Sequence, residues 1–245
     1  MFTRSEKILL ALLALIQFTH IVDFMIMMPL GPPLMRELSM SPAQFGWVIS
    51  AYTFAAGIMS FMGAFFLDKL DRRRALIALS IGFAIGTLSC SLAPGFYFLM
   101  AARATAGAFG GVMSSTVLAI IGDSITVERR GRAMGVIMAA FSAASVLGVP
   151  FSIFLATHYS WHAPFIFLGV AALINTVAIT LWLSPMTSHL GRELMSPVRV
   201  VFQLLATRET SSRLLFMALL IFGQFTIIPF LSPSLVANNG LPESQ

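Results

Sequence analysis

The 245 residues of this chain are 58% apolar and only 10% charged. Because a soluble domain carries about 25% charged residues, this chain cannot cover a globular surface with polar groups, and lipid must be its solvent. Its net charge of +5 comes from basic residues between apolar runs, which indicates membrane topology and not nucleic-acid binding. The single cysteine, Cys90, excludes an internal disulfide and a cysteine-based metal site. We therefore expect a membrane protein with no cofactor and no nucleic-acid partner.

Six apolar runs are long enough to cross a bilayer as helices, since a span needs about 20 apolar residues. The first run is too long for a signal peptide, and no small-residue cleavage site follows it. Ser41 and Pro42 are typical of a helix start, so the second span is expected to begin there. Polar loops are expected at residues 31–42 and 122–132. The six runs cover residues 8–30, 43–67, 75–92, 96–121, 133–156 and 164–183.

The segment at residues 184–212 is longer and more polar than the other connections. Its apolar residues recur at roughly helical spacing, which predicts an amphipathic helix on the membrane surface. These residues are Val198, Val201, Phe202, Leu204 and Leu205. A seventh apolar run follows at residues 214–231. We therefore divide the chain into a six-helix transmembrane bundle at 1–183, a cytoplasmic linker at 184–212, and the first helix of an incomplete second bundle at 213–245. We expect the chain to be part of a longer protein that completes this second bundle.

The basic residues between the spans fall almost entirely on one side of the membrane. Even-numbered crossings return the chain to the side of its N-terminus, so thirteen Lys and Arg residues lie on that side and only Arg36 lies on the other. Because loops rich in basic residues stay in the cytoplasm, the N-terminus is predicted to be cytoplasmic. The expected location is the inner membrane of a bacterium.

Two formal charges fall inside the predicted spans, Asp23 in the first and Arg103 in the fourth. Both lie about 10 Å below the outer surface, given a helical rise of about 1.5 Å per residue. A lone charge in hydrocarbon costs several kcal/mol, so we expect the two side chains to pair or to share a water-filled cavity. His20 and Gln17 lie on the same helix face as Asp23, so this face is expected to line a cavity. A structural ion pair without a part in transport is the alternative for Asp23 and Arg103.

A cluster of charges, Asp68-Lys69-Leu70-Asp71-Arg72-Arg73-Arg74, separates the second span from the third. It resembles the loop after helix 2 of the major facilitator superfamily, whose pattern is Gly-x-x-x-Asp-Arg/Lys-x-Gly-x-Arg/Lys-Arg/Lys. Ala64 and Asp71 replace the two glycines of that pattern. Three further segments resemble motifs of proton-coupled efflux members of the family. They are Pro29-Leu30-Gly31-Pro32 after Asp23, Arg103-Ala104-Thr105-Ala106-Gly107 in the fourth span, and Gly148-Val149-Pro150 in the fifth.

The resemblance implies an all-α polytopic membrane fold, in which six helices form two inverted three-helix repeats and make half of a 12-helix transporter. It also implies a cytoplasmic latch that holds the outward-open state. In this latch Asp68 would meet a helix end of the second half, and Asp123 would be the acidic partner of the arginines. Gly148 and Pro150 are expected to kink or closely pack the fifth span. Simple topological charge is the alternative for the latch residues, which are Asp68, Lys69, Arg72, Arg73, Arg74 and Asp123.

The function that the resemblance implies is the export of small molecules, drug-like compounds or sugars, by alternating access against the entry of protons. Asp23, Arg103, His20 and Gln17 are the candidate proton-coupling residues, and no catalytic or metal-binding residue is expected. The alternatives are an uncoupled facilitator or uniporter and, in different classes, an intramembrane enzyme or a seven-helix receptor. Asp23 has no second aspartate at its depth, which disfavours the enzyme. The seventh span has no lysine, which excludes a retinal Schiff base there.

Overall fold

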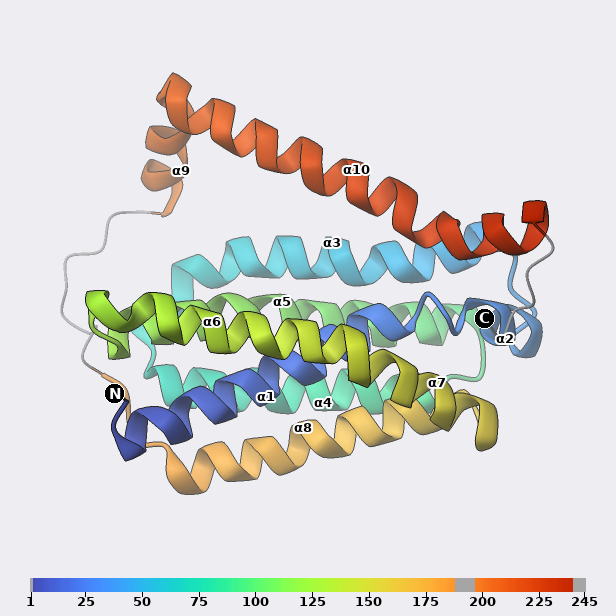
Figure 1. The fold of residues 1–245 in the computed structure, drawn as a ribbon, viewed down its shortest axis with the longest axis horizontal. Coiled ribbons are helices and arrows are strands. Elements are labelled where there is room, and N and C mark those ends of the chain that lie inside the picture. Colours follow the sequence, from blue (N-terminus) through green and yellow to red (C-terminus); the bar gives the residue numbers. More distant parts are fainter. Residues whose placement is uncertain (1, 188–196, 240–245) are drawn as a thin grey trace. The chain divides into compact units, whose positions relative to one another are not determined.

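The computed structural model describes residues 2–187 and 197–239, which are largely helical and contain no β-strand. The chain divides into two compact units, Met1–Arg192 and Glu193–Gln245. The second unit contains α9 (Pro197–Ala206) and α10 (Arg208–Asn239). Only the backbone is described for Asp68, for parts of α9 and for α10 beyond residue 223. The first unit (Figure 1) contains α1 (Arg4–Ile26), α2 (Gly31–Glu37), α3 (Pro42–Phe66), the 3₁₀ turn η1 (Leu67–Lys69), α4 (Arg72–Ser91), α5 (Phe96–Ser124), α6 (Val127–Ala143), the π-helical turn η2 (Ala144–Gly148), α7 (Val149–His158) and α8 (His162–Trp182).

Six helical spans in the described residues are long and apolar enough to cross a membrane. They are α1, α3, α4, α5, α8 and the continuous run from α6 through η2 to α7. The six spans predicted from the sequence are thereby confirmed, with ends that differ by a few residues. The predicted seventh span at residues 214–231 lies within α10.

The prediction of polar loops at residues 31–42 and 122–132 is wrong in part, because much of each segment is helical. Residues 31–42 contain α2, whose first turn accommodates two prolines. Residues 122–132 contain the end of α5 and the start of α6, so that only Ile125 and Thr126, both extended, interrupt the helices. Long basic side chains can reach water from a helix end, so charge alone does not require a loop.

The first turns of α1 and α3 share one capping arrangement. At the start of α3, the Ser41 hydroxyl accepts a hydrogen bond from the Gln44 N–H at 3.2 Å, and the Gln44 side chain accepts one from the Ser41 N–H at 2.8 Å. Thr3 and Glu6 form the same reciprocal pair in α1. Such a pair satisfies backbone N–H groups that have no partner within the helix. The helix start predicted at Ser41 is therefore confirmed.

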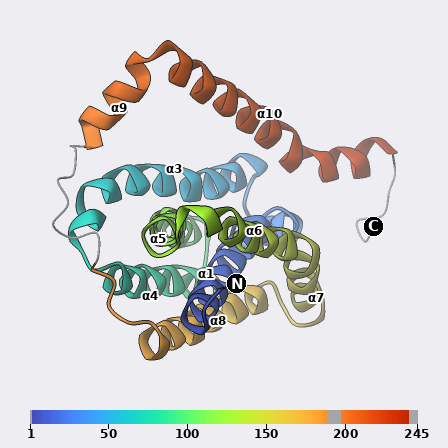
Figure 2. The same ribbon diagram turned by 60° about the vertical axis from the view of Figure 1, so that its left-hand side comes forward.

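The helix α5 lies between α3 and α4 and packs closely on both (Figures 1 and 2). A Cβ atom on Gly107 of α5 would lie 2.2 Å from the carbonyl oxygen of Tyr52 in α3. A Cβ atom on Gly86 of α4 would lie 2.5 Å from the backbone nitrogen of Ala106 in α5. Backbones approach this closely in membranes only where side chains are absent. Glycine therefore sets the spacing of these three helices. The helix α4 also packs on α8, and α1 packs on α6 and α8.

Two of the six spans are much more exposed than the others. In the most apolar stretch of each span, 11% of α3 and 22% of the α6–α7 run are buried, against 56% of α1 and of α4. The exposed side chains are large and apolar, among them Phe54 and Phe61 in α3 and Phe141 in α6. These two spans therefore present apolar faces that the described residues of the first unit leave uncovered.

The fifth span changes its helical geometry midway. It passes through η2, and Pro150 occupies the first turn of α7 directly afterwards. Proline has no N–H to donate to the preceding turn, and π-helical turns occur mostly as short interruptions inside α-helices. Gly148 ends η2 against α1, where a Cβ atom would lie 2.3 Å from Val22 Cγ2. The segment Gly148-Val149-Pro150 therefore combines an irregular turn with close helix packing.

The second unit contains α9 inside the segment where an amphipathic helix is predicted. The described apolar side chains Phe202, Leu204 and Leu205 are exposed. The side chains of Val198 and Val201, which complete the predicted apolar face, lie outside the described residues.

Candidate functional site

The two charges inside the predicted spans meet within the first unit. Arg103 Nη1 in α5 lies 2.8 Å from Asp23 Oδ2 in α1. Their side chains are 1% and 0% exposed, so the ion pair is shielded from solvent. Of the two arrangements expected from the sequence, pairing or a shared water-filled cavity, the structure has the pair.

Both oxygens of the Asp23 carboxylate have partners. Oδ2 accepts from Arg103, and Oδ1 accepts from the hydroxyl of Thr87 in α4 at 3.2 Å. Arg103 Nη1 also donates to the backbone carbonyl of Asp23 at 3.2 Å. Removing two charges from water is costly, and the attraction offsets that cost only when further hydrogen bonds satisfy the buried groups. The ion pair is thus held by α1, α4 and α5 together.

Tyr52 of α3 provides Arg103 with a second partner. The guanidinium carbon of Arg103 lies 4.2 Å from the centroid of the Tyr52 ring. A guanidinium at this distance from a desolvated aromatic face gains about 2 kcal/mol. Gly107, one turn after Arg103, permits the contact because the backbone of Tyr52 occupies the place of its Cβ atom. Arg103 therefore rests between a carboxylate and an aromatic ring.

Sequence reasoning missed Tyr52 and Thr87. Neither residue is charged, and hydroxyl-bearing side chains occur throughout these spans. One signal was available in Gly107, since a glycine one turn from a buried arginine indicates that another helix passes close by. Which residue of that helix reaches Arg103 depends on the tertiary packing and could not be derived from spacing.

The other predicted residues of this face of α1 do not join the ion pair. Gln17 Oε1 accepts a hydrogen bond from the Ser114 hydroxyl of α5 at 3.3 Å. His20 lies near the rings of Tyr52 and Phe83, at centroid distances of 6.2 and 6.0 Å. Within the described part of the chain, neither ring nitrogen of His20 has a hydrogen-bond partner. The predicted polar face is therefore present, but its members occupy three different environments.

One pair of the predicted latch forms near the start of α4. Arg72 Nε lies 3.2 Å from Asp123 Oδ2 near the end of α5, and the side chains are 8% and 20% exposed. Lys69 and Arg74 are exposed. The side chain of Asp68 lies outside the described residues. The structure thus brings Asp123 together with an arginine of the charge cluster, as the resemblance implies.

Asp71 stands where the family pattern has glycine. Its φ of −56° lies in a region open to every residue type, so glycine is not needed here. Its Oδ1 accepts hydrogen bonds from the N–H groups of Arg73 and Met186, each at 2.9 Å. Arg73 in turn donates to the carbonyl oxygen of Thr180 in α8. Asp71 therefore caps α4 and fastens the chain that follows α8 to the same point.

Replacing Asp123 by Asn should lower the stability by about 1 kcal/mol. The substitution keeps the shape of the side chain but removes the charge that strengthens its bond with Arg72. Thermal unfolding of the purified protein measures the loss. Arg74→Gln is the control, because Arg74 is exposed on the same helix and should tolerate the loss of its charge. Equal shifts in both variants would contradict a specific Arg72–Asp123 bond.

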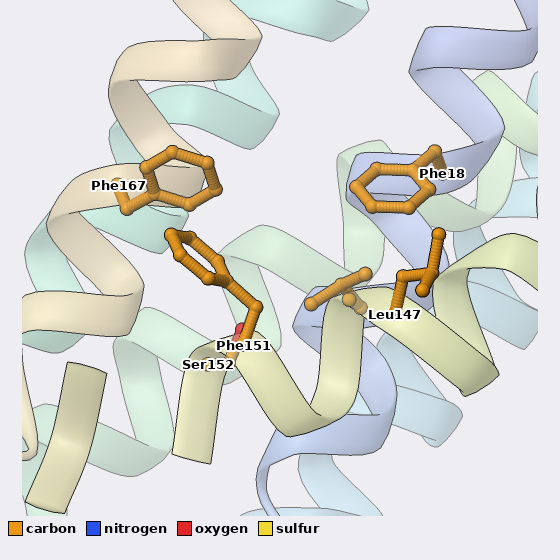
Figure 3. Close-up of a pocket in the computed structure, with 7 residues that line it drawn as sticks. Phe18, Leu147, Phe151, Ser152 and Phe167 are labelled. Carbon is orange, nitrogen blue, oxygen red and sulfur yellow. The ribbon is translucent and has the colours of Figure 1, made fainter. Parts of the chain in front are cut away.

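A cavity of about 380 Å³ lies beside the irregular part of the fifth span. It is almost entirely apolar, and Phe151 and Phe167 meet edge to face across α7 and α8 at a centroid distance of 5.2 Å (Figure 3). Among the described lining residues, Ser152 carries the one side-chain polar group. Gly148 of the segment Gly148-Val149-Pro150 forms part of the cavity wall, whereas Asp23 and Arg103 do not line the cavity. The lining residues are Phe18, Val22, Leu147, Gly148, Phe151, Ser152 and Phe167.

The fold and the buried charges define an all-helical, multi-pass membrane protein with an ion pair inside its first bundle. A family profile described as Major Facilitator Superfamily matches residues 13–243. The chain belongs to this superfamily, and its class is that of transporters and not of enzymes.

Individual relatives agree with this assignment. The chain is 28% identical over 233 residues to an uncharacterized MFS-type transporter, YceJ, of Bacillus subtilis. The aligned residues are 94% of this chain and 59% of that protein. It is 32% identical over 131 residues to the puromycin resistance protein pur8 of Streptomyces alboniger. Here the aligned residues are 53% of this chain and 26% of that protein. The chain thus spans about three fifths of the length of YceJ.

Solved structures support the same fold. A crystal structure of a bacterial homolog of the human lysosomal transporter Spinster, inward-facing and unoccupied, matches with a TM-score of 0.77 at 18% identity. The match covers 100% of this chain and 58% of that one. The chain therefore has the fold of one half of a transporter, together with the helix that follows it.

Proposed function

We propose that this chain is the first part of a secondary active transporter that exports small molecules by alternating access, in exchange for protons. The observation that carries the proposal is the buried pair of Asp23 and Arg103. Charges inside membrane spans are costly and usually mark ion or substrate pathways. In this transporter, Asp23 binds and releases the proton, and Arg103 responds to the change of charge.

The contacts of Arg103 explain how one proton can alter the bundle. When Asp23 binds a proton, the carboxylate charge disappears, and the attraction that holds Arg103 at 2.8 Å is lost. The guanidinium then retains the ring of Tyr52, 4.2 Å away, as its partner. The two charge states of Asp23 therefore favour two positions of Arg103 between α1 and α3. A ligand that binds one position better shifts the equilibrium between them.

The cluster at residues 68–74 is the cytoplasmic latch in this proposal. Arg72 and Asp123 join α4 to α5 on that side of the bundle. Asp71 joins the same point to the chain after α8. These bonds make the start of α4 a fixed anchor, against which Asp68 of η1 would engage the second half of the transporter.

The orientation in the membrane is inferred from charge, and the surfaces that meet lipid and a second half are inferred from exposure. We place the N-terminus and the latch in the cytoplasm, on the inner membrane of a bacterium, because basic residues gather on that side. The exposed apolar faces of α3 and α6–α7 face lipid and the second half, which the remaining length of relatives such as YceJ would supply. The partners are thus the lipid bilayer, protons, a small-molecule substrate and the C-terminal half.

The substrate class in this proposal is drug-like or sugar-like small molecules. A relative at 32% identity over 131 residues carries the name of a puromycin resistance protein, which is consistent with drug export. Apolar side chains such as Phe24 and Met25 on α1 suit amphiphilic compounds, because aromatic rings and the flexible thioether adapt to different shapes.

Asp23→Asn in the full-length transporter tests the proposal. In membrane vesicles, the unchanged protein should move its substrate faster when a proton gradient is imposed. The variant should lose that acceleration, because an amide cannot carry the proton. Glu37→Gln is the control, since Glu37 is an exposed acid at the end of α2 and should keep the gradient dependence.

The second candidate is an uncoupled facilitator in which Asp23 and Arg103 form a structural ion pair. The observation in its favour is that both oxygens of Asp23 have partners, Arg103 and Thr87, in a bundle that excludes solvent. In that case the unchanged protein would transport equally well with and without the proton gradient. This outcome would replace antiport by facilitated transport.

A further inference from the structure

Three buried polar atoms of two residues lie near the ion pair. They are Nδ1 and Nε2 of His20 in α1 and the hydroxyl oxygen of Tyr52 in α3, and none has a hydrogen-bond partner in the described part of the chain. Tyr52 is 2% exposed. Buried polar atoms are almost always bonded to protein or to ordered water, because an unmade bond leaves the cost of desolvation unopposed. Their grouping therefore requires an explanation.

Two of these atoms lie close to one point on the backbone of α5. A Cβ atom on Gly110 would lie 2.9 Å from the Tyr52 hydroxyl oxygen and 3.0 Å from His20 Nε2. Because Gly110 carries no side chain, α1 and α3 can both turn a polar atom toward this place. The neighbours on other sides are aromatic rings, with Phe83 of α4 at 6.0 Å from His20 and Phe24 of α1 at 5.6 Å from Tyr52 between centroids.

The occupant of this place must be small. The three atoms are inaccessible to solvent in the described structure, so a transported molecule bound between two halves would not reach them. Water meets the requirement, since a buried water makes about three hydrogen bonds and can donate as well as accept. The phenol can donate or accept, and the imidazole offers one of each in its neutral form.

We propose that His20 and Tyr52 bind buried water beside Gly110, and that this water takes the proton from Asp23 when the transporter releases it. His20 lies one helical turn from Asp23, and the ring of Tyr52 contacts the guanidinium of Arg103. A water molecule bound by His20 and Tyr52 would therefore lie next to the ion pair. The water site follows from the geometry alone, whereas its use by the proton rests on the proposed antiport.

The proton transfer balances without any further reactant. The O–H bond of the Asp23 carboxyl group breaks as the water oxygen accepts its proton, and the water gives one of its own protons to a nitrogen of His20. His20 then holds the proton as an imidazolium, until the proton passes to solvent water when the transporter opens this place to the cytoplasm. His20 is thus neutral before the transfer and after this release, and Asp23 is left as the carboxylate that pairs with Arg103.

Tyr52→Phe in the full-length transporter tests the water site through the sign of its effect on thermal unfolding. If water binds the hydroxyl, the substitution removes a made hydrogen bond, and we expect the unfolding midpoint to fall. If the hydroxyl has no partner, the substitution removes a buried unsatisfied group, and the midpoint stays unchanged or rises; that result overturns the water site. Tyr97→Phe is the control, because Tyr97 is 78% exposed and should show no shift.

An independent measurement is a density map that resolves ordered water. Density is expected within hydrogen-bond distance of both the Tyr52 hydroxyl and His20. A map that shows ordered water elsewhere in the bundle, but none at this place, overturns the site whether or not the Tyr52 variant folds.

A proton-release experiment tests the use of the water. Substrate added to the unchanged transporter should release a proton, and Tyr52→Phe should slow this release. If the unchanged protein releases no proton, the proposed antiport fails. If it releases the proton and Tyr52→Phe does so at the same rate, antiport stands and the role of the water fails.

Discussion

Arg103→Leu is expected to lower the stability of the folded transporter by about 3–5 kcal/mol, which is the usual cost of removing one partner from a buried ion pair. Asp23 is fully buried, and without Arg103 its charge would keep, among the described side chains, only the hydroxyl of Thr87 as a partner. The ring of Tyr52 would lose its contact with the guanidinium as well. Reversible unfolding of the purified protein in mixed micelles measures the loss.

The matched control is the double variant Asp23→Leu with Arg103→Leu. Replacing both members of a buried pair by apolar residues leaves no uncompensated charge and is often neutral for stability. The double variant should therefore be more stable than the single one. If the single variant unfolds no more easily than the double variant, the pair does not hold the bundle as the structure indicates. Transport should be lost in both, because neither retains the pair that we propose to couple transport to protons.

Gly107→Ala is expected to cost about 3 kcal/mol, the upper end of the usual range for adding a methyl group to a well-packed site. The new Cβ atom would lie 2.2 Å from the carbonyl oxygen of Tyr52, and this atom belongs to a backbone that cannot rotate away. The helices α3 and α5 would have to separate. The gain of about 1 kcal/mol in helix propensity from glycine to alanine does not offset that displacement.

The control for this substitution is Gly135→Ala in α6. No atom lies within 4 Å of the place where its Cβ would be, so the variant should be as stable as the unchanged protein or slightly more stable. Both variants are compared by thermal unfolding. Similar stability of the Gly107 and Gly135 variants would mean that the close contact between α3 and α5 is absent in the folded protein.

The spans could be predicted from the sequence because lipid imposes one requirement on all of them. A run of about 20 apolar residues is typical of a transmembrane helix, so six spans and their order follow from hydropathy. The loops were harder to predict, since Gly31 begins a helix although prolines surround it, and Glu128 lies in a helix among charged residues. A helix end at the membrane surface can carry proline and charge as readily as a loop does, and composition does not distinguish the two.

Only the charged residues of the candidate site could be predicted from the sequence. Asp23 and Arg103 stand out in apolar spans, and counting residues placed them at one depth. Tyr52 reaches Arg103 because Gly107 lets two backbones meet, and that contact depends on the rotation and spacing of α3 and α5. Asp71 was an unexplained departure from a glycine in the motif until its bonds to Arg73 and Met186 showed a helix cap.

Direct proton counting tests most closely whether Asp23 carries the exchanged proton, as we propose. The full-length transporter is purified, placed in weakly buffered solution with a pH indicator, and mixed with saturating substrate. The unchanged protein should release a proton, and Asp23→Asn should bind the same substrate without releasing one. Proton release of equal size from Asp23→Asn would contradict the claim and assign the proton to another group.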